Sequence, residues 1–249
     1  MNSAIREVDE ERVSSLLYLR GVLPALGEYL RFCEPGWSRG GVVFKGPDHL
    51  SGVWPEEEVV RGAGCLELRF PKFRDIIGLF ERGRGWFFPV GGWHHLGRLL
   101  EFRRNGAAFE SALRAGSPGK ELIQIQLNLL LRLASLLYGE DEDLRGRVGA
   151  LPERPIELLF GRAAFPEPAA AWVCARPSGC LSWSTGRATE PVAGRLAVED
   201  PGVIREVFSG SLIGEEAVNR GAVRMSGNIP AIQSLNLVFE ALEGRVKPI

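Results

Sequence analysis

The sequence predicts an α/β protein that folds as two tandem, related domains, residues 1–118 and 119–249. Each half shows the same order of patterns, which is a strand, a helix, a second strand and a second helix. The turn-forming sequence Ser117-Pro118-Gly119 separates the halves. A chain of 249 residues suits one large domain or two of modest size, so the length permits this division.

The second half carries the clearest element signals, in residues 194–242. Residues 194–198 alternate apolar and polar side chains, as a half-buried strand does. Asp200-Pro201 is a helix-start signal, because aspartate caps free amides and proline is tolerated in the first turn. A short helix over 214–220 and a brief strand over 223–225 follow. Asn228 then caps a last amphipathic helix.

Three motifs in this stretch resemble the sterol carrier protein type 2 family. They read Phe208-Ser209-Gly210, Ala217-Val218-Asn219-Arg220-Gly221 and Val223-Arg224-Met225-Ser226-Gly227-Asn228. The resemblance implies two sterol-carrier-like domains, each a small, twisted and mostly antiparallel sheet covered by helices. It further implies an apolar tunnel between the sheet and the final helix, which holds a lipid-like ligand.

The first half repeats the order of elements with bulkier side chains, so we expect a degenerate copy. CLELRF-PKFRDIIGLFERG matches GRLAVED-PGVIREVFSG, and GWFFPVGGWHHL matches GAVRMSGNIPAI, which places Leu96 on Ile232. The first copy lacks the residues with which the second builds its short helix. A hairpin precedes each copy, and in the second half we assign it to residues 171–175 and 180–185, with Gly179 at a positive φ in the turn.

Three further segments carry structural predictions. Gly21 and Pro24 should kink or split the first helix. Leu122–Tyr138 is apolar but contains three amides and an arginine, so it predicts a core or interface helix rather than a membrane span. The acidic run 140–143 is expected to be a solvated loop, and Ile156–Phe160 fits a helical turn or a buried strand equally.

Charge and cysteine usage exclude several classes of function. The net charge of −1 gives no electrostatic footprint for nucleic acid or for an anionic membrane, and no stable membrane insertion is expected. The four cysteines form no CxxC pair and the three histidines are scattered, so we expect no metal site, no cofactor and reduced thiols in the cytoplasm. The charged N-terminus does not fit a secretion signal.

The chemistry-bearing residues do not predict an enzyme. His94 and His95 are adjacent on a helix and cannot chelate one ion together, and the paired glutamates resemble solvated surface groups. No GxSxG, HExxH or phosphate-loop motif occurs. Arg82 and Arg84 beside Trp86 fit either a contact with an anionic head group or a solvated turn.

We therefore expect non-enzymatic binding or carriage of an apolar ligand, such as a fatty acyl, sterol or isoprenoid-like molecule. Simple core packing explains the aromatic residues equally well. One alternative is a protein-interaction or accessory module with a collapsed pocket, which acts as a homodimer or with a protein partner. Another is an enzyme or accessory subunit that acts on a lipid-like substrate. The expected ligand-binding residues all lie in the second copy, which looks the more open: Trp172, Trp183, Leu196, Val198, Phe208, Leu212, Ile213, Met225, Ile229, Ile232, Leu235 and Phe239.

Overall fold

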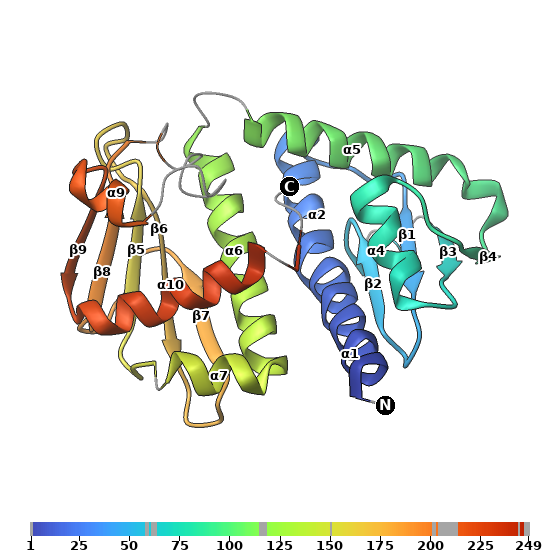
Figure 1. The fold of residues 1–249 in the computed structure, drawn as a ribbon. Coiled ribbons are helices and arrows are strands. Elements are labelled where there is room, and N and C mark those ends of the chain that lie inside the picture. The colour runs from blue at the N-terminus through green and yellow to red at the C-terminus, as the bar shows by residue number, and fades with distance from the viewer. Residues whose placement is uncertain are drawn as a thin grey trace. The chain divides into compact units, whose positions relative to one another are not determined.

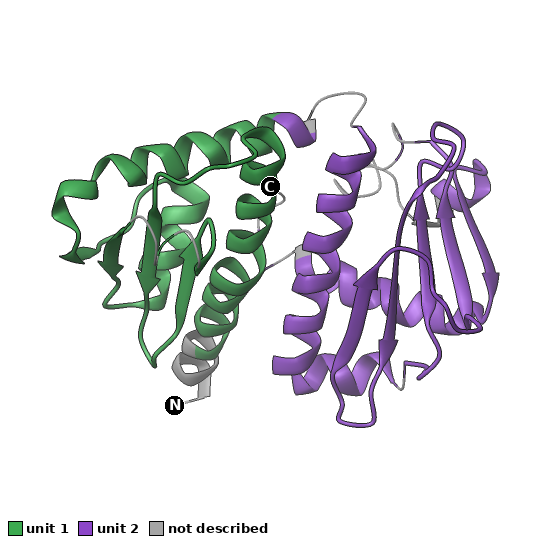
Figure 2. Ribbon diagram, turned by 180° about the vertical axis from the view of Figure 1, so that it is seen from behind, with its two compact units in different colours: residues 1–111 green, residues 112–249 purple. Residues whose placement is uncertain are grey.

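The computed structural model describes residues 2–57, 60, 64–114, 119–149, 151–200, 203, 214–243 and 245–246. The chain divides into two compact units, residues 1–111 (unit 1) and 112–249 (unit 2), as Figure 2 shows. Each unit combines helices with one mixed sheet in which most strand pairs are antiparallel. The predicted fold class, two small helix-covered sheets in tandem, is confirmed.

Unit 1 contains a four-stranded sheet of order β2-β1-β3-β4, in which only β1 and β3 run parallel (Figure 1). Its elements are α1 (Asn2–Leu17), the π-helical η1 (Tyr18–Val22), α2 (Leu23–Cys33), β1 (Gly41–Lys45), β2 (Ser51–Trp54), β3 (Cys65–Arg69), α4 (Phe73–Arg82), β4 (Phe88–Gly91), the 3₁₀-helical η2 (Trp93–His95) and α5 (Gly97–Arg114).

The predicted interruption of the first helix takes the form of the π-helical turn η1. The backbone N–H of Leu23 bonds to the carbonyl of Tyr18, five residues back, and Pro24 stands in the first turn of α2. Proline has no N–H to donate and its ring crowds the preceding turn, so widening the helix just before it relieves the clash. The helical path therefore continues without a break.

Aromatic rings fill the core of unit 1. Phe44 of β1 contacts Phe80 of α4 and Phe102 of α5, with ring centroids 6.0 and 5.2 Å apart. Trp54 meets Phe102 at 5.6 Å, and the side chains of Phe44 and Trp54 are fully buried. The interlocking rings leave this helix-facing side of the sheet closely packed.

Unit 2 contains a five-stranded sheet of order β7-β6-β5-β8-β9, in which only β5 and β8 run parallel. Its elements are α6 (Lys120–Glu140), α7 (Glu142–Val148), β5 (Ile156–Phe160), β6 (Ala169–Ala175), β7 (Leu181–Thr185), β8 (Gly194–Val198), α9 (Gly214–Asn219), β9 (Val223–Gly227) and α10 (Ile229–Glu243).

Two sequence assignments in unit 2 are settled by this topology. The ambiguous segment Ile156–Phe160 is the central strand, and all five of its residues are buried. The acidic run is not a loop throughout, because Asp141 accepts a hydrogen bond from Leu144 N at 2.8 Å and caps α7. Two acidic residues then occupy the first turn of α7, where they complement the helix dipole.

Helix α6 is the one described helix long and apolar enough to cross a membrane by length and composition. In the structure it packs along β6 and β7 as part of the fold of unit 2. Its sheet side includes Ile123, Leu127 and Leu131, which are completely buried. This is the behaviour of a core helix, as the interrupting polar residues predicted.

The two sheets share one topology. The predicted hairpin of β6 and β7 is present, but it is not the counterpart of the hairpin in unit 1. Each sheet has one parallel pair, β1 with β3 in unit 1 and β5 with β8 in unit 2. Aligning these pairs matches the order β2-β1-β3-β4 of unit 1 to β6-β5-β8-β9 of unit 2. The first hairpin thus matches β5 and β6 rather than β6 and β7. Strand β7 is an additional edge strand of unit 2.

Two glycines mark equivalent points of the repeat. Gly92 and Gly227 each follow or end the last strand with a positive φ, 69° and 83°. A Cβ on Gly92 would lie 1.9 Å from the carbonyl oxygen of Cys65, and one on Gly227 would lie 2.5 Å from that of Ala193. Only glycine fits both the backbone angle and the close approach. An irregularity in the β3–β4 ladder shifts the register, so Gly92, not Gly91, is the counterpart of Gly227.

Candidate functional site

The side of the unit 2 sheet that faces α6 and α10 is its apolar side, which we call the inner face. Helix α10 covers β8, since a Cβ on Gly194 would lie 3.1 Å from the Cδ1 atom of Ile232. Helix α6 covers the other edge, where Arg132 stacks over the Trp183 ring at 5.8 Å. Val173 is the register partner of both Ile156 and Trp183. These three residues of neighbouring strands therefore point to the inner face.

Four of the expected ligand-binding residues lie on strands of the inner face. Leu196 of β8 and Met225 of β9 are direct register partners, and both are only half-buried. Val198 is completely buried, whereas Trp183 on β7 is half-buried. An apolar sheet face beneath a helix normally loses nearly all contact with water. Leu196 and Met225 instead keep some contact with solvent, near the edge strand β9.

Four more expected residues lie in α10. Ile232 and Leu235 are each 1% exposed, while Ile229 and Phe239 are half-buried. The helix begins close to the sheet, because Asn228 N donates to Ala193 O at 2.9 Å. The Asn228 side chain then caps the helix by accepting from Ala231 N at 3.2 Å, as the sequence predicted. This end of the inner face is closed.

Small side chains occupy the inner face where unit 1 has rings. Ala169 and Ala171 of β6 are completely buried and occupy little volume beneath α6, and Gly194 of β8 has no side chain. On the helix-facing side of the unit 1 sheet, Phe44 and Trp54 supply buried rings. The inner face of unit 2 also holds a buried ring, that of Phe160, which is the register partner of both Ala169 and Val198.

The remaining expected residues do not join this group. Trp172 lies on the opposite face of the sheet, because it is the register partner of Glu157, whereas Val173 is the residue that faces the helices. Phe208, Leu212 and Ile213 lie outside the described residues. Eight of the twelve expected residues thus lie on the inner face or in α10, the helix that covers β8.

The opposite face holds a buried carboxylate that the sequence reasoning did not single out. Glu157 of β5 is 1% exposed and accepts hydrogen bonds from Arg187 Nε at 2.7 Å, Arg195 Nε at 2.6 Å and Ala188 N at 3.3 Å. Its only sequence signal is an acidic residue inside the apolar run IELLF. The carboxylate is fully engaged by these donors, so it ties β5 to β8 and to the β7–β8 connection.

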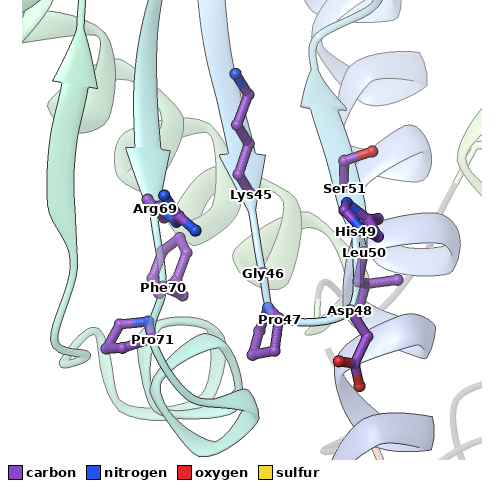
Figure 3. A pocket seen from close by; sticks show the side chains of 10 residues that line it. All are labelled: Lys45, Gly46, Pro47, Asp48, His49, Leu50, Ser51, Arg69, Phe70 and Pro71. Carbon is purple, nitrogen blue, oxygen red and sulfur yellow. The ribbon is translucent and has the colours of Figure 1, made fainter.

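A separate open pocket of about 710 Å³ lies at the tip of the β1–β2 hairpin in unit 1, lined by residues 45–51 and 69–71 (Figure 3). Lys45 on its rim is paired with Glu67 at 2.6 Å. Figure 3 shows the Lys45 and Asp48 side chains pointing in opposite directions, so the charged groups do not converge. This rim fits a solvated surface hollow better than a ligand site.

The positive φ angles of Asp48 and His49, 51° and 60°, have a local explanation. Leu50 N bonds to Pro47 O at 2.9 Å, so these two residues form the centre of a tight hairpin turn. Two-residue hairpins favour such left-handed angles because they match the twist of the strands. The strain at this pocket therefore belongs to the turn.

The histidine pair lies in η2, with ring centroids 4.0 Å apart. Desolvation, together with the neighbouring charges of His94 and Arg98, lowers the pKa of His95. Within the described ranges, no group of three or more histidine, cysteine, aspartate or glutamate side chains is arranged to hold a metal ion.

Comparison with known proteins gives similarities in fold. No protein-family model and no curated protein matches the sequence. The UbiJ-SCP2 ubiquinone synthesis protein is 15% identical over 51% of this chain and 96% of its own, with a TM-score of 0.36. Sterol carrier protein domain 2 of Helicoverpa armigera is 17% identical over 54% of this chain and all of its own, with a TM-score of 0.35.

An enzyme also shows this similarity over a small part of its length. The stereoselective inverting sec-alkylsulfatase Pisa1 from Pseudomonas sp. is 14% identical, with a TM-score of 0.33, and the match covers 56% of this chain and 23% of the sulfatase. The two sterol carrier protein matches cover about half of this chain and nearly all of each matched domain. At these identities the similarity concerns fold alone.

Proposed function

We propose that unit 2 binds an apolar, lipid-like ligand without chemical change, between the inner face of its sheet and α10. The observation that carries this proposal is the half-buried Leu196–Met225 pair on a helix-covered, apolar face. Small residues at Ala169, Ala171 and Gly194 occupy little volume there. The sequence resemblance to sterol carrier proteins supports the same assignment.

The energetics of such a site favour a chain-like ligand. Each methylene removed from water contributes about 0.8 kcal/mol, so two additional methylenes tighten binding by about tenfold until the space is full. The closed end at Asn228 and Gly194 sets one limit of the site. All four cysteines are free thiols, which fits the cytoplasmic location that forms part of this proposal.

Mass spectrometry of the intact, gently purified protein tests this function. A mass above that of the chain, lost on denaturation with release of a lipid, is the expected result. A ligand-free mass, combined with no saturable binding of a fluorescent fatty acid, overturns the proposal. Turnover of a bound lipid would instead favour an enzyme, and a stable heteromer with an empty site would favour a partner-binding module.

A filling variant locates the site. Met225→Trp is expected to weaken binding of a long-chain fatty acid by tenfold or more, because the larger ring occupies the ligand's space. Leu237→Trp is the matched control, since Leu237 lies in α10 but is 45% exposed. Equal binding by both variants would place the ligand elsewhere.

A further inference from the structure

Unit 1 exposes an unusual concentration of apolar side chains. Eight large apolar residues of the described chain are exposed, and six of them fall within residues 86–100. Trp86, Trp93 and Leu100 are 66%, 60% and 65% exposed. Scattered exposed apolar residues are ordinary, but a concentration of this size marks a contact surface. The set is Trp86, Phe88, Val90, Trp93, Leu96 and Leu100.

These six residues lie at the edge of the sheet, on and before strand β4 and in the η2–α5 segment that follows it. Strand β4 is an edge of the sheet, and Figure 1 shows the start of α5 beside its end. The rings of Trp86 and Phe88 meet edge to face with centroids 6.0 Å apart. Trp93, Leu96 and Leu100 are spaced by three and four residues, so they follow one side of the η2–α5 segment.

Arginines without ion-pair partners accompany this surface. Arg82, Arg84, Arg103 and Arg104 are exposed, and none forms an ion pair within the described part of the chain. The Arg103 guanidinium lies over the turn before β4, since a Cβ on Gly83 would be 2.8 Å from its Nη2 atom. Arg103 of α5 therefore lies close to the α4–β4 turn, which Arg82 and Arg84 flank.

The local charge contrasts with that of the whole chain. Residues 82–104 contain five arginines and one glutamate, a net charge of +4, whereas the chain as a whole carries −1. The glutamate, Glu101, is held by Arg98 at 2.8 Å, so four cations remain uncompensated. We call the six apolar residues and these four arginines the docking surface.

We propose that the docking surface binds reversibly to an anionic lipid surface. Tryptophan, phenylalanine and leucine partition into the interfacial region of a bilayer, and tryptophan favours the level of the head groups. The uncompensated arginines attract anionic head groups at the same level. Isologous pairing of two copies through this surface would bring the same arginines against one another, which like-charge repulsion disfavours. This proposal does not depend on what unit 2 holds.

Cosedimentation of the intact protein with lipid vesicles tests the proposal. We expect binding to vesicles of phosphatidylcholine with phosphatidylglycerol, little binding to phosphatidylcholine alone, and a loss of binding as salt screens the charges. Arg82→Glu with Arg84→Glu is expected to reduce the partition coefficient roughly tenfold or more. Arg154→Glu, an exposed position in unit 2, is the matched control and should leave binding unchanged.

A second measurement reports the apolar contact. Lipids brominated in their acyl chains should quench tryptophan fluorescence, and the double variant Trp86→Phe, Trp93→Phe should lose most of that quenching. Leu100→Ser should weaken binding, whereas Leu237→Ser in unit 2 should not. No binding to anionic vesicles, or equal binding by the arginine variant and its control, overturns the proposal. The protein could instead fail to bind vesicles and form a concentration-dependent dimer, or a stable complex with an acidic protein, that the same variants abolish. That result would assign the surface to a protein contact and would also overturn the proposal.

Discussion

The buried Glu157 gives a quantitative test of what holds unit 2 together. Two variants separate the contribution of the carboxylate from that of its partners. Arg195→Ala removes one donor and leaves the carboxylate inside, whereas Glu157→Leu removes the buried charge itself. Both arginine side chains are partly exposed to solvent, by 39% for Arg195 and 56% for Arg187.

The expected magnitudes follow from these contacts. A hydrogen bond to a charged group contributes about 1.5–3 kcal/mol, so Arg195→Ala should lower the free energy of unfolding by about 2–3 kcal/mol. Glu157→Leu should cost only about 0–1.5 kcal/mol, because the exposed guanidinium groups regain water and leucine suits the strand. The larger loss should thus come from the more exposed residue.

Urea unfolding of the intact chain, followed by tryptophan fluorescence, measures both values. Trp172 reports locally because it is the cross-strand partner of Glu157. Arg176→Ala is the control, since that arginine bonds an exposed serine at 2.9 Å and should change the stability by less than about 0.5 kcal/mol. A greater loss from Glu157→Leu than from Arg195→Ala would refute the reasoning.

Three other outcomes are expected in unit 1. Gly92→Ala should lower the free energy of unfolding in urea by about 2 kcal/mol or more, because its Cβ would collide with a carbonyl oxygen. The control Gly179→Ala in unit 2 has a similar φ of 78° but open space around the Cβ, so it should cost about 1 kcal/mol. Burial raises the pKa of Cys65, so at pH 8 iodoacetamide should label it more slowly than the exposed Cys33, as peptide mass spectrometry would detect. Burial, with a smaller contribution from Cys33, raises the pKa of Tyr29 to about 12. The free energy of unfolding should therefore keep this contribution below pH 10 and lose it as pH rises toward 12. Tyr29→Phe should reduce that loss in unfolding curves measured at a series of pH values.

Local signals in the sequence were sufficient for many elements of the fold. The alternation in Cys65–Arg69, the Asn228 cap of α10 and the Gly179 turn each depend on residues within a few positions of one another. Such signals survive folding because tertiary contacts reinforce them. The predicted order of elements in both halves followed from these local patterns.

The parts that could not be predicted depend on distant contacts. The central strand β5 contains Glu157, whose arginine partners lie 30 and 38 residues away, so nothing local identified the carboxylate as satisfied. The hairpin pairing was mistaken because only the parallel ladder between β5 and β8 reveals which strand is central. Trp172 and Trp183 were both expected to bind the ligand, but the period of two along a strand places Trp172 on the other face.

The proposed function has a consequence for how the chain evolves. A domain whose centre is occupied by its own rings keeps its shape when no guest is available, whereas a hollow one gains stability from its cargo. Under this proposal unit 2 holds the ligand, so exposed tryptophans such as Trp86 and Trp93 in unit 1 leave ligand retention unaffected. The repeat would in this way free unit 1 to contact the surroundings while unit 2 keeps the proposed ligand.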